Sequence, residues 1–107
     1  MPQDPQSAFR ALSDPTRRAI LAILADGDRT IGDVASAFDM TRPAVKKHLS
    51  ILETGGLIDV EAKGRERINR LNPDGLRPVI DWLEFFDRFW DDRLSDLTAA
   101  LNKDPRP

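Results

Sequence analysis

The chain has 107 residues, which predicts one domain spanning 1–107 with a small hydrophobic core. It contains no cysteine, so disulfides, thiolate metal ligands and thiol redox switches are excluded, and it contains one histidine. No apolar run is long enough to cross a membrane, and the N-terminus lacks the features of a signal peptide, so we expect a cytoplasmic protein with no membrane partner.

The formal net charge of -2 conceals an uneven distribution along the chain. Residues 1–40 carry a net charge of -2, residues 41–72 carry +3, and residues 73–107 carry -3. A protein that binds nucleic acid needs a local basic surface, and only the middle block offers one. A block of this size also arises by chance in a short chain, so charge alone leaves DNA binding open.

Two helices are expected in the first part of the chain. Residues 7–12 form a short helix whose apolar members are Phe9 and Leu12. The second helix follows Asp14, a residue type that caps helix starts, and has a proline in its first turn. Gly27 is a typical helix stop.

The third helix is predicted to begin at Thr30, because Thr30 and Asp33 have the spacing of an acidic capping box. Apolar residues then recur at helical spacing as far as Phe38. The two residues that follow leave room only for a tight turn. Aspartate tolerates a left-handed backbone, so Asp39 suits that turn.

The fourth helix is predicted to begin at the cap Thr41 and to end at two glycines, so residues 30–54 form a helix-turn-helix. Its residues divide into an apolar arc and a polar arc at about 100° per residue. His48 lies at the edge of the apolar arc. We interpret it as a packing residue with a hydrogen-bond partner, with a DNA contact as the alternative. The polar arc contains Arg42, Pro43, Lys46, Lys47 and Ser50. We predict that these residues contact DNA, and that the cap residue Thr41 does so as well.

Residues 57–71 predict a β-hairpin, because apolar residues alternate with charged ones on both sides of a glycine turn at 63–65. The tip of this hairpin is basic. We predict that it also contacts DNA, through Lys63, Arg65 and Arg67.

A long helix from about residue 76 to residue 101 is predicted to close the chain. It carries five of the seven aromatic residues, and its apolar arc is too wide to be covered by one contact. We therefore expect a homodimer, with a pocket for a small organic effector as the alternative use of the same surface. The predicted dimer interface contains Phe9, Leu12, Leu83, Phe86, Trp90, Leu94, Leu97 and Leu101.

These elements predict a mainly α fold with a small β-hairpin: a winged helix-turn-helix of five helices and a wing, with a long C-terminal dimerisation helix. In such a module the second helix of the helix-turn-helix enters the major groove of double-stranded DNA, and the wing reaches a minor groove or phosphates. A winged helix that serves only protein interaction is the alternative. That alternative does not require basic residues gathered on one side.

Three stretches closely resemble the ArsR family of bacterial winged-helix repressors: FRALSDPTRRAILAIL, TRPAVKKHLSILETGGLI and GRERINRLNPDGL. The resemblance implies a dimeric repressor that acts at an inverted-repeat operator, with the first and last helices in the dimer interface. Many family members sense metals through cysteines, or through His and carboxylates on the last helix. This chain has no cysteine, and its last helix has no His, so we expect a non-metal-sensing member without a cofactor.

Catalytic chemistry is not indicated by the sequence. The single histidine lies within the fourth predicted helix, and no nucleophile–base pair or Gly-rich phosphate loop is visible. We therefore predict no catalytic residues and no enzymatic activity.

Overall fold

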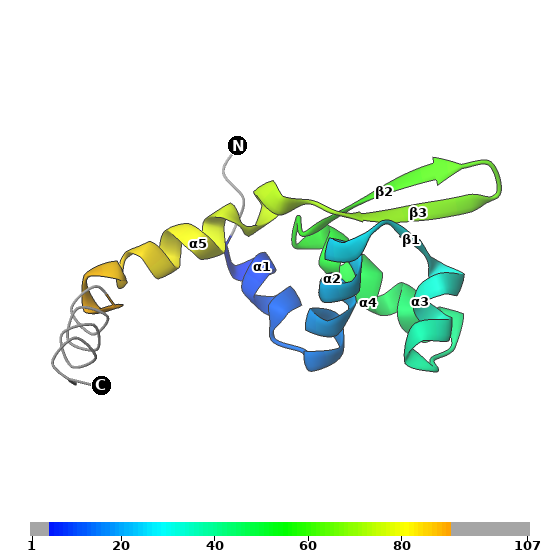
Figure 1. Cartoon of the computed structure of the whole chain (residues 1–107), viewed down its shortest axis with the longest axis horizontal. Coiled ribbons are helices and arrows are strands. Elements are labelled where there is room, and N and C mark those ends of the chain that lie inside the picture. The colour runs from blue at the N-terminus through cyan, green and yellow to red at the C-terminus, as the bar shows by residue number, and fades with distance from the viewer. Residues whose placement is uncertain (1–4, 91–107) are drawn as a thin grey trace, which may run out of the picture.

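The computed structural model describes residues 5–90 (Figure 1). Helices α1 to α4 pack together, the sheet projects from them on one side, and α5 leads away on the other (Figure 1). This is the predicted winged helix-turn-helix architecture. The elements are α1 (Pro5–Leu12), α2 (Pro15–Asp26), β1 (Arg29–Thr30), α3 (Ile31–Phe38), α4 (Arg42–Thr54), β2 (Ile58–Lys63), β3 (Glu66–Leu71), the 3-10 helix η1 (Pro73–Leu76) and α5 (Arg77–Glu84).

The caps predicted from the sequence start α2, α3 and α4. Asp14 accepts a hydrogen bond from the Arg17 amide at 3.0 Å. Thr30 and Asp33 form the reciprocal capping box, with bonds of 3.0 and 3.1 Å. The Thr41 hydroxyl accepts from the amide three residues later at 3.3 Å. Because these side chains satisfy amides that lack a helical partner, each helix begins next to its cap.

The turn between α3 and α4 passes through Asp39, whose backbone is left-handed with φ 52° and ψ 48°. The Met40 amide donates to the Ala35 carbonyl at 3.0 Å, which closes the end of α3. The short turn fixes how α4 leaves α3 and therefore where the exposed side of α4 lies.

The core lies between α1, α2, α3, α4 and the base of the sheet. Its buried apolar side chains are Ala8, Ala11, Ile20, Leu21, Leu24, Val34, Val45, Leu49, Leu52, Leu57 and Ile58. Three of these belong to the apolar arc predicted for α4, so the opposite arc of that helix faces solvent. Among residues 5–90, no helix combines the length and apolar character that crossing a membrane requires.

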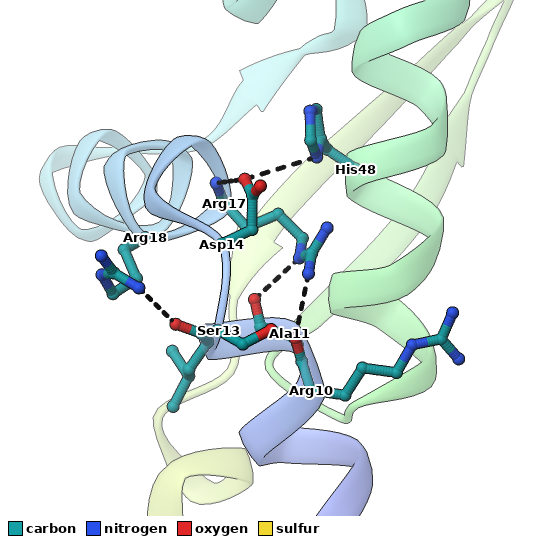
Figure 2. A network of polar contacts seen from close by, with 8 residues as sticks. Arg10, Ala11, Ser13, Asp14, Arg17, Arg18 and His48 are labelled. Carbon is teal, nitrogen blue, oxygen red and sulfur yellow. Dashed lines mark hydrogen bonds and ion pairs between the residues drawn. The ribbon is translucent and has the colours of Figure 1, made fainter.

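A buried guanidinium joins α1 to α2. Arg17 is 9% exposed; its Nε donates to the Ala11 carbonyl at 2.8 Å and its Nη2 to the Arg10 carbonyl at 2.9 Å (Figure 2). Arg18 donates to the Leu12 carbonyl at 2.7 Å. The last carbonyls of α1, which lack helical partners, are therefore satisfied by side chains of α2. No local sequence pattern indicates this role of Arg17.

We predict that Arg17→Ala lowers the free energy of unfolding by about 3 kcal/mol, because buried carbonyls lose charge-assisted hydrogen bonds. Thermal unfolding followed by circular dichroism measures the change. The control is Arg18→Ala, which removes one exposed bond and should cost about 0.5 kcal/mol or less. Equal losses in the two variants would contradict the structural role of Arg17.

The sheet contains a third strand, β1, which was not predicted from the sequence. The strand order is β1-β3-β2, and both pairings are antiparallel. Arg29 of β1 pairs with Asn69 of β3; the Asn69 side chain is buried and donates to the Arg29 carbonyl at 3.2 Å. A strand of two residues is too short to show the alternation that identifies strands in a sequence.

The hairpin turn is one residue shorter than predicted. Lys63 pairs with Glu66 as the last rung of the ladder, so the loop consists of Gly64 and Arg65. Gly64 has φ 65°, a left-handed conformation that glycine adopts without a steric penalty.

The C-terminal helix also departs from the prediction, because it is interrupted. After α5 the chain makes a turn at 85–86 and is helical again at 87–90. Phe85 donates to the Trp82 carbonyl at 3.2 Å and Phe86 to the Leu83 carbonyl at 2.9 Å, the bonding of a tighter 3-10 turn. Apolar spacing indicates which side of a helix is covered but does not specify the hydrogen-bond register, so no sequence pattern predicts this turn.

Candidate nucleic-acid interface

The exposed arc of α4 carries the residues predicted to contact DNA. All six are exposed: Thr41, Arg42, Pro43, Lys46, Lys47 and Ser50. Val45 and Leu49, on the opposite arc, are buried in the core. Among the described residues, none of the three basic side chains of this arc forms an ion pair. The arc therefore offers unpaired positive charge to an anionic partner.

Arg42 lies at the point where α3 and α4 begin. A Cβ added at Gly32, in the first turn of α3, would meet an Arg42 guanidinium nitrogen at 2.9 Å. Ile31, Pro43 and Lys46 surround an open hollow of about 370 Å³ together with Arg42. This places a planar cation beside a shallow apolar surface at the start of the helix.

A second hollow, of about 100 Å³, separates α4 from the sheet. It brings Arg67 of β3 together with Lys46 and Ser50 of α4. Two of the other predicted contacts, Lys63 and Arg65, are exposed at the hairpin tip and are not among the residues that line this hollow. The wing residues therefore fall into two groups, one beside α4 and one at the tip.

Glu53, which was not among the predicted site residues, lines the same hollow. It is exposed and lies seven positions after Lys46, two helical turns along the same side of α4. Extending the helical wheel to the end of α4 would have revealed it. Asn69, which also lines the hollow, owes its position to long-range pairing with β1, and no local sequence pattern indicates it.

One basic residue of the middle block is already paired. Arg70 donates to Asp28 at 3.1 Å and to Glu61 at 3.2 Å. These hydrogen bonds, first that to Asp28, raise the pKa of Arg70. Two carboxylates therefore share this guanidinium, and it contributes less to an anion-binding surface than Arg67 does.

The structure partly corrects the interpretation of His48. Its side chain is 22% exposed, which agrees with a packing position. The expected hydrogen bond is wrong: Nδ1 is buried without a partner. The nearest carboxylate oxygen, Asp14 Oδ2, lies 3.9 Å away, too far for a hydrogen bond (Figure 2).

Two of the predicted dimer residues, Leu83 and Trp90, belong to an exposed apolar area, here called the α5 aromatic surface. Its exposed members are Ile80, Trp82, Leu83, Phe85, Phe89 and Trp90. Phe9 of α1 packs against this surface, with its ring centroid 5.4 Å from that of Trp82. Phe86 is half-buried, and its ring centroid lies 5.0 Å from that of Trp82. Leu12 packs against the core. The other three predicted residues, Leu94, Leu97 and Leu101, lie outside the described residues.

Comparison with known proteins places these features in a family. A helix-turn-helix domain model matches residues 12–61. The transcriptional repressor SdpR of Bacillus subtilis is 40% identical over 77 residues, which cover 72% of this chain and 86% of SdpR. The crystal structure of an ArsR family transcriptional regulator aligns with a TM-score of 0.73 and 36% identity, covering 80% of this chain and 94% of that one. The chain belongs to the ArsR family.

This membership confirms the predicted class: the ArsR-family chain is a DNA-binding transcription regulator and not an enzyme. A further neighbour is the homodimeric winged helix-turn-helix DNA-binding domain of a possible ArsR-family regulator from Mycobacterium bovis. It is 25% identical, has a TM-score of 0.64, and the alignment covers 76% of this chain and 78% of that domain.

That this ArsR-family chain does not sense metals stays a prediction. Among the residues that the structure describes, no group of three or more His, Asp or Glu side chains could hold a metal ion. The expectation of a non-metal-sensing member rests on the sequence, which has no cysteine and one histidine.

Proposed function

We propose that the chain is a cytoplasmic, homodimeric repressor that binds an inverted-repeat operator through the exposed arc of α4 and the β2–β3 wing. One observation carries the proposal. The apolar arc of α4 is buried while Arg42, Lys46 and Lys47 remain exposed and unpaired on the opposite arc. A helix seated in this way presents a cationic side of the width that the major groove admits.

The roles of the contact residues follow from their places on the elements. Arg42 lies at the start of α4, the end of a recognition helix that reaches base edges. Lys46 and Arg67 face one hollow between helix and wing, where a phosphate between the two would be neutralised from both sides. Lys63 and Arg65, at the wing tip, are placed to reach the backbone or minor groove beyond it. Thr41, Pro43, Lys47 and Ser50 complete the surface.

The dimer is proposed to form through the α5 aromatic surface. Large apolar patches on a single chain mark contact sites, and a two-fold axis would cover the same patch on both protomers. The homodimeric Mycobacterium bovis domain supports this assembly. Two recognition helices about 34 Å apart would then read two half-sites on one side of the duplex. A small organic effector bound at this surface stays an alternative prediction.

The function is tested by selecting fragments of the source genome on the purified full chain, followed by mobility shifts of the enriched duplex at graded salt concentrations. We expect an inverted repeat, called the selected duplex below, and an affinity that falls steeply as salt rises. The alternative of a protein-interaction module predicts no enriched sequence and would replace this proposal if that were the result.

Sequence preference should depend on Arg42 more than on the lysines. Arg42→Ala is expected to relax discrimination at one position of each half-site, because a bidentate arginine–guanine contact discriminates by about 1–3 kcal/mol. Repeating the selection with the variant measures this. Lys47→Ala is the comparison, because a phosphate contact should weaken all sequences alike. An unchanged preference in Arg42→Ala would reassign Arg42 to the phosphate backbone.

A further inference from the structure

His48 faces away from the proposed DNA surface, toward the start of α2. Figure 2 shows its imidazole pointing across the gap to Asp14, with Nδ1 3.9 Å from Oδ2. Among the described residues, Nδ1 is the only buried side-chain nitrogen or oxygen that lacks a hydrogen-bond partner. A buried polar atom without a hydrogen-bond partner destabilises the fold. A conformation in which Nδ1 makes a hydrogen bond would therefore be more stable.

Asp14 belongs to the network that joins α1 and α2. Its carboxylate accepts from the Arg17 amide at 3.0 Å, and the Arg17 guanidinium holds the last carbonyls of α1. The amide of Arg17, above all, lowers the pKa of Asp14. The carboxylate therefore keeps its negative charge at any pH near neutrality. It is held at the junction of α1 and α2, against which α4 packs.

The charges around His48 can be enumerated for the described residues. Within 4.0 Å, Asp14 is the one ion-pair partner, and α1, α3 and the sheet contribute none. Arg17 is the cation of the same network, but its guanidinium is bonded to α1. On α4 itself, Lys47 is the neighbouring cation and is exposed on the opposite arc. A proton on the imidazole would therefore act mainly against Asp14.

We propose that Asp14 and His48 are positioning residues for the recognition helix α4, and that protonation of His48 draws the pair into a charge-assisted hydrogen bond that favours the DNA-bound placement of α4. Closing the gap from 3.9 Å to about 2.8 Å takes a movement of roughly 1 Å, and the bond once made ties α4 to the α1–α2 junction. A neutral imidazole carries its proton on one of the two ring nitrogens, whereas an imidazolium donates from both. Protonation therefore places a donor on Nδ1 in every tautomeric state and adds the positive charge that attracts the Asp14 carboxylate. This inference rests on the proposed DNA-binding function.

The proposed pair predicts that the affinity for DNA depends on pH. Histidine is the side chain that ordinarily changes charge between about pH 5 and pH 8, and this chain has one histidine and no cysteine. We expect the affinity for the selected duplex to be about threefold to tenfold higher at about pH 6 than at about pH 8, measured at one fixed salt concentration.

Two conservative variants separate the pair from other effects. Asp14→Asn keeps an oxygen that can cap α2 but removes the charge, and His48→Gln keeps an amide donor that does not titrate. Each should abolish the pH dependence, and the double variant should behave like the single ones. If the imidazolium acted only by adding positive charge near DNA, Asp14→Asn would retain the pH dependence. That result, or a wild-type affinity equal at both pH values, would overturn the proposal.

A second readout does not use DNA. In nuclear magnetic resonance of the full chain, the side-chain carboxyl ¹³C shift of Asp14 should follow the titration of His48 in the wild type and should lose this step in His48→Gln. An Asp14 signal that ignores the imidazole would overturn the pairing. If the chain bound no duplex at either pH, the proposed function would fail, while this measurement would still decide whether the pair forms.

Discussion

Lys46→Ala/Lys47→Ala is expected to bind the selected duplex about 100-fold to 1,000-fold more weakly than the wild type near 0.1 M salt. Both lysines are exposed on α4 and make no ion pair among the described residues, so their charges are available to phosphates. A dimer would lose four cationic contacts. The salt dependence should fall accordingly, by roughly 0.9 units of slope per lost phosphate contact. Mobility shifts at several salt concentrations measure both quantities.

The matched control for the lysine variant removes the same charge elsewhere. Arg10 and Arg77 are exposed on α1 and α5, outside the arc that is proposed to meet DNA. Arg10→Ala/Arg77→Ala should therefore change affinity through the overall field alone, by about threefold or less at this salt concentration. If the control weakened binding as much as the lysine variant does, the DNA surface would be wrongly placed.

Leu83→Glu/Trp90→Glu is expected to convert the protein from dimer to monomer and to remove most of its affinity for the selected duplex. Both residues are more than half exposed on the single chain, at 51% and 61%. The substitutions should therefore be tolerated by the fold. In the dimer, however, carboxylates would be buried without partners at an apolar contact, at a cost of several kcal/mol.

Light scattering at micromolar concentration follows the dimer directly, since one chain has a mass of 12.0 kDa. The control, Ala22→Glu, places a negative charge on an exposed position of α2 and should leave the mass and the affinity unchanged. The loss of specific binding follows because one recognition helix makes too few contacts for a useful specificity ratio. A wild-type protein that is monomeric and binds an inverted repeat at full strength would rule out the dimer.

Features that depend on neighbours a few residues apart could be predicted before the fold was known. The starts of α3 and α4 follow from Thr30, Asp33 and Thr41, whose side chains bond to amides of the first turn. The left-handed turn at Asp39 is equally local. The division of α4 into a buried and a cationic arc follows from the helical period alone. These properties depend only on the geometry of a helix and on hydrogen bonds between near neighbours, so they can be predicted from a sequence.

Features that depend on residues far apart in the chain are visible only in the folded molecule. Asn69 is buried because it pairs with Arg29 of β1, which lies 40 positions earlier in the chain. The hollow lined by Arg67 and Glu53 exists because the sheet packs beside α4. His48 faces Asp14 because α2 and α4 pack against each other at this point. The expected hydrogen bond of His48 is not made there. No spacing in a sequence encodes such contacts, because they arise from how separate elements pack, and packing depends on the whole core at once.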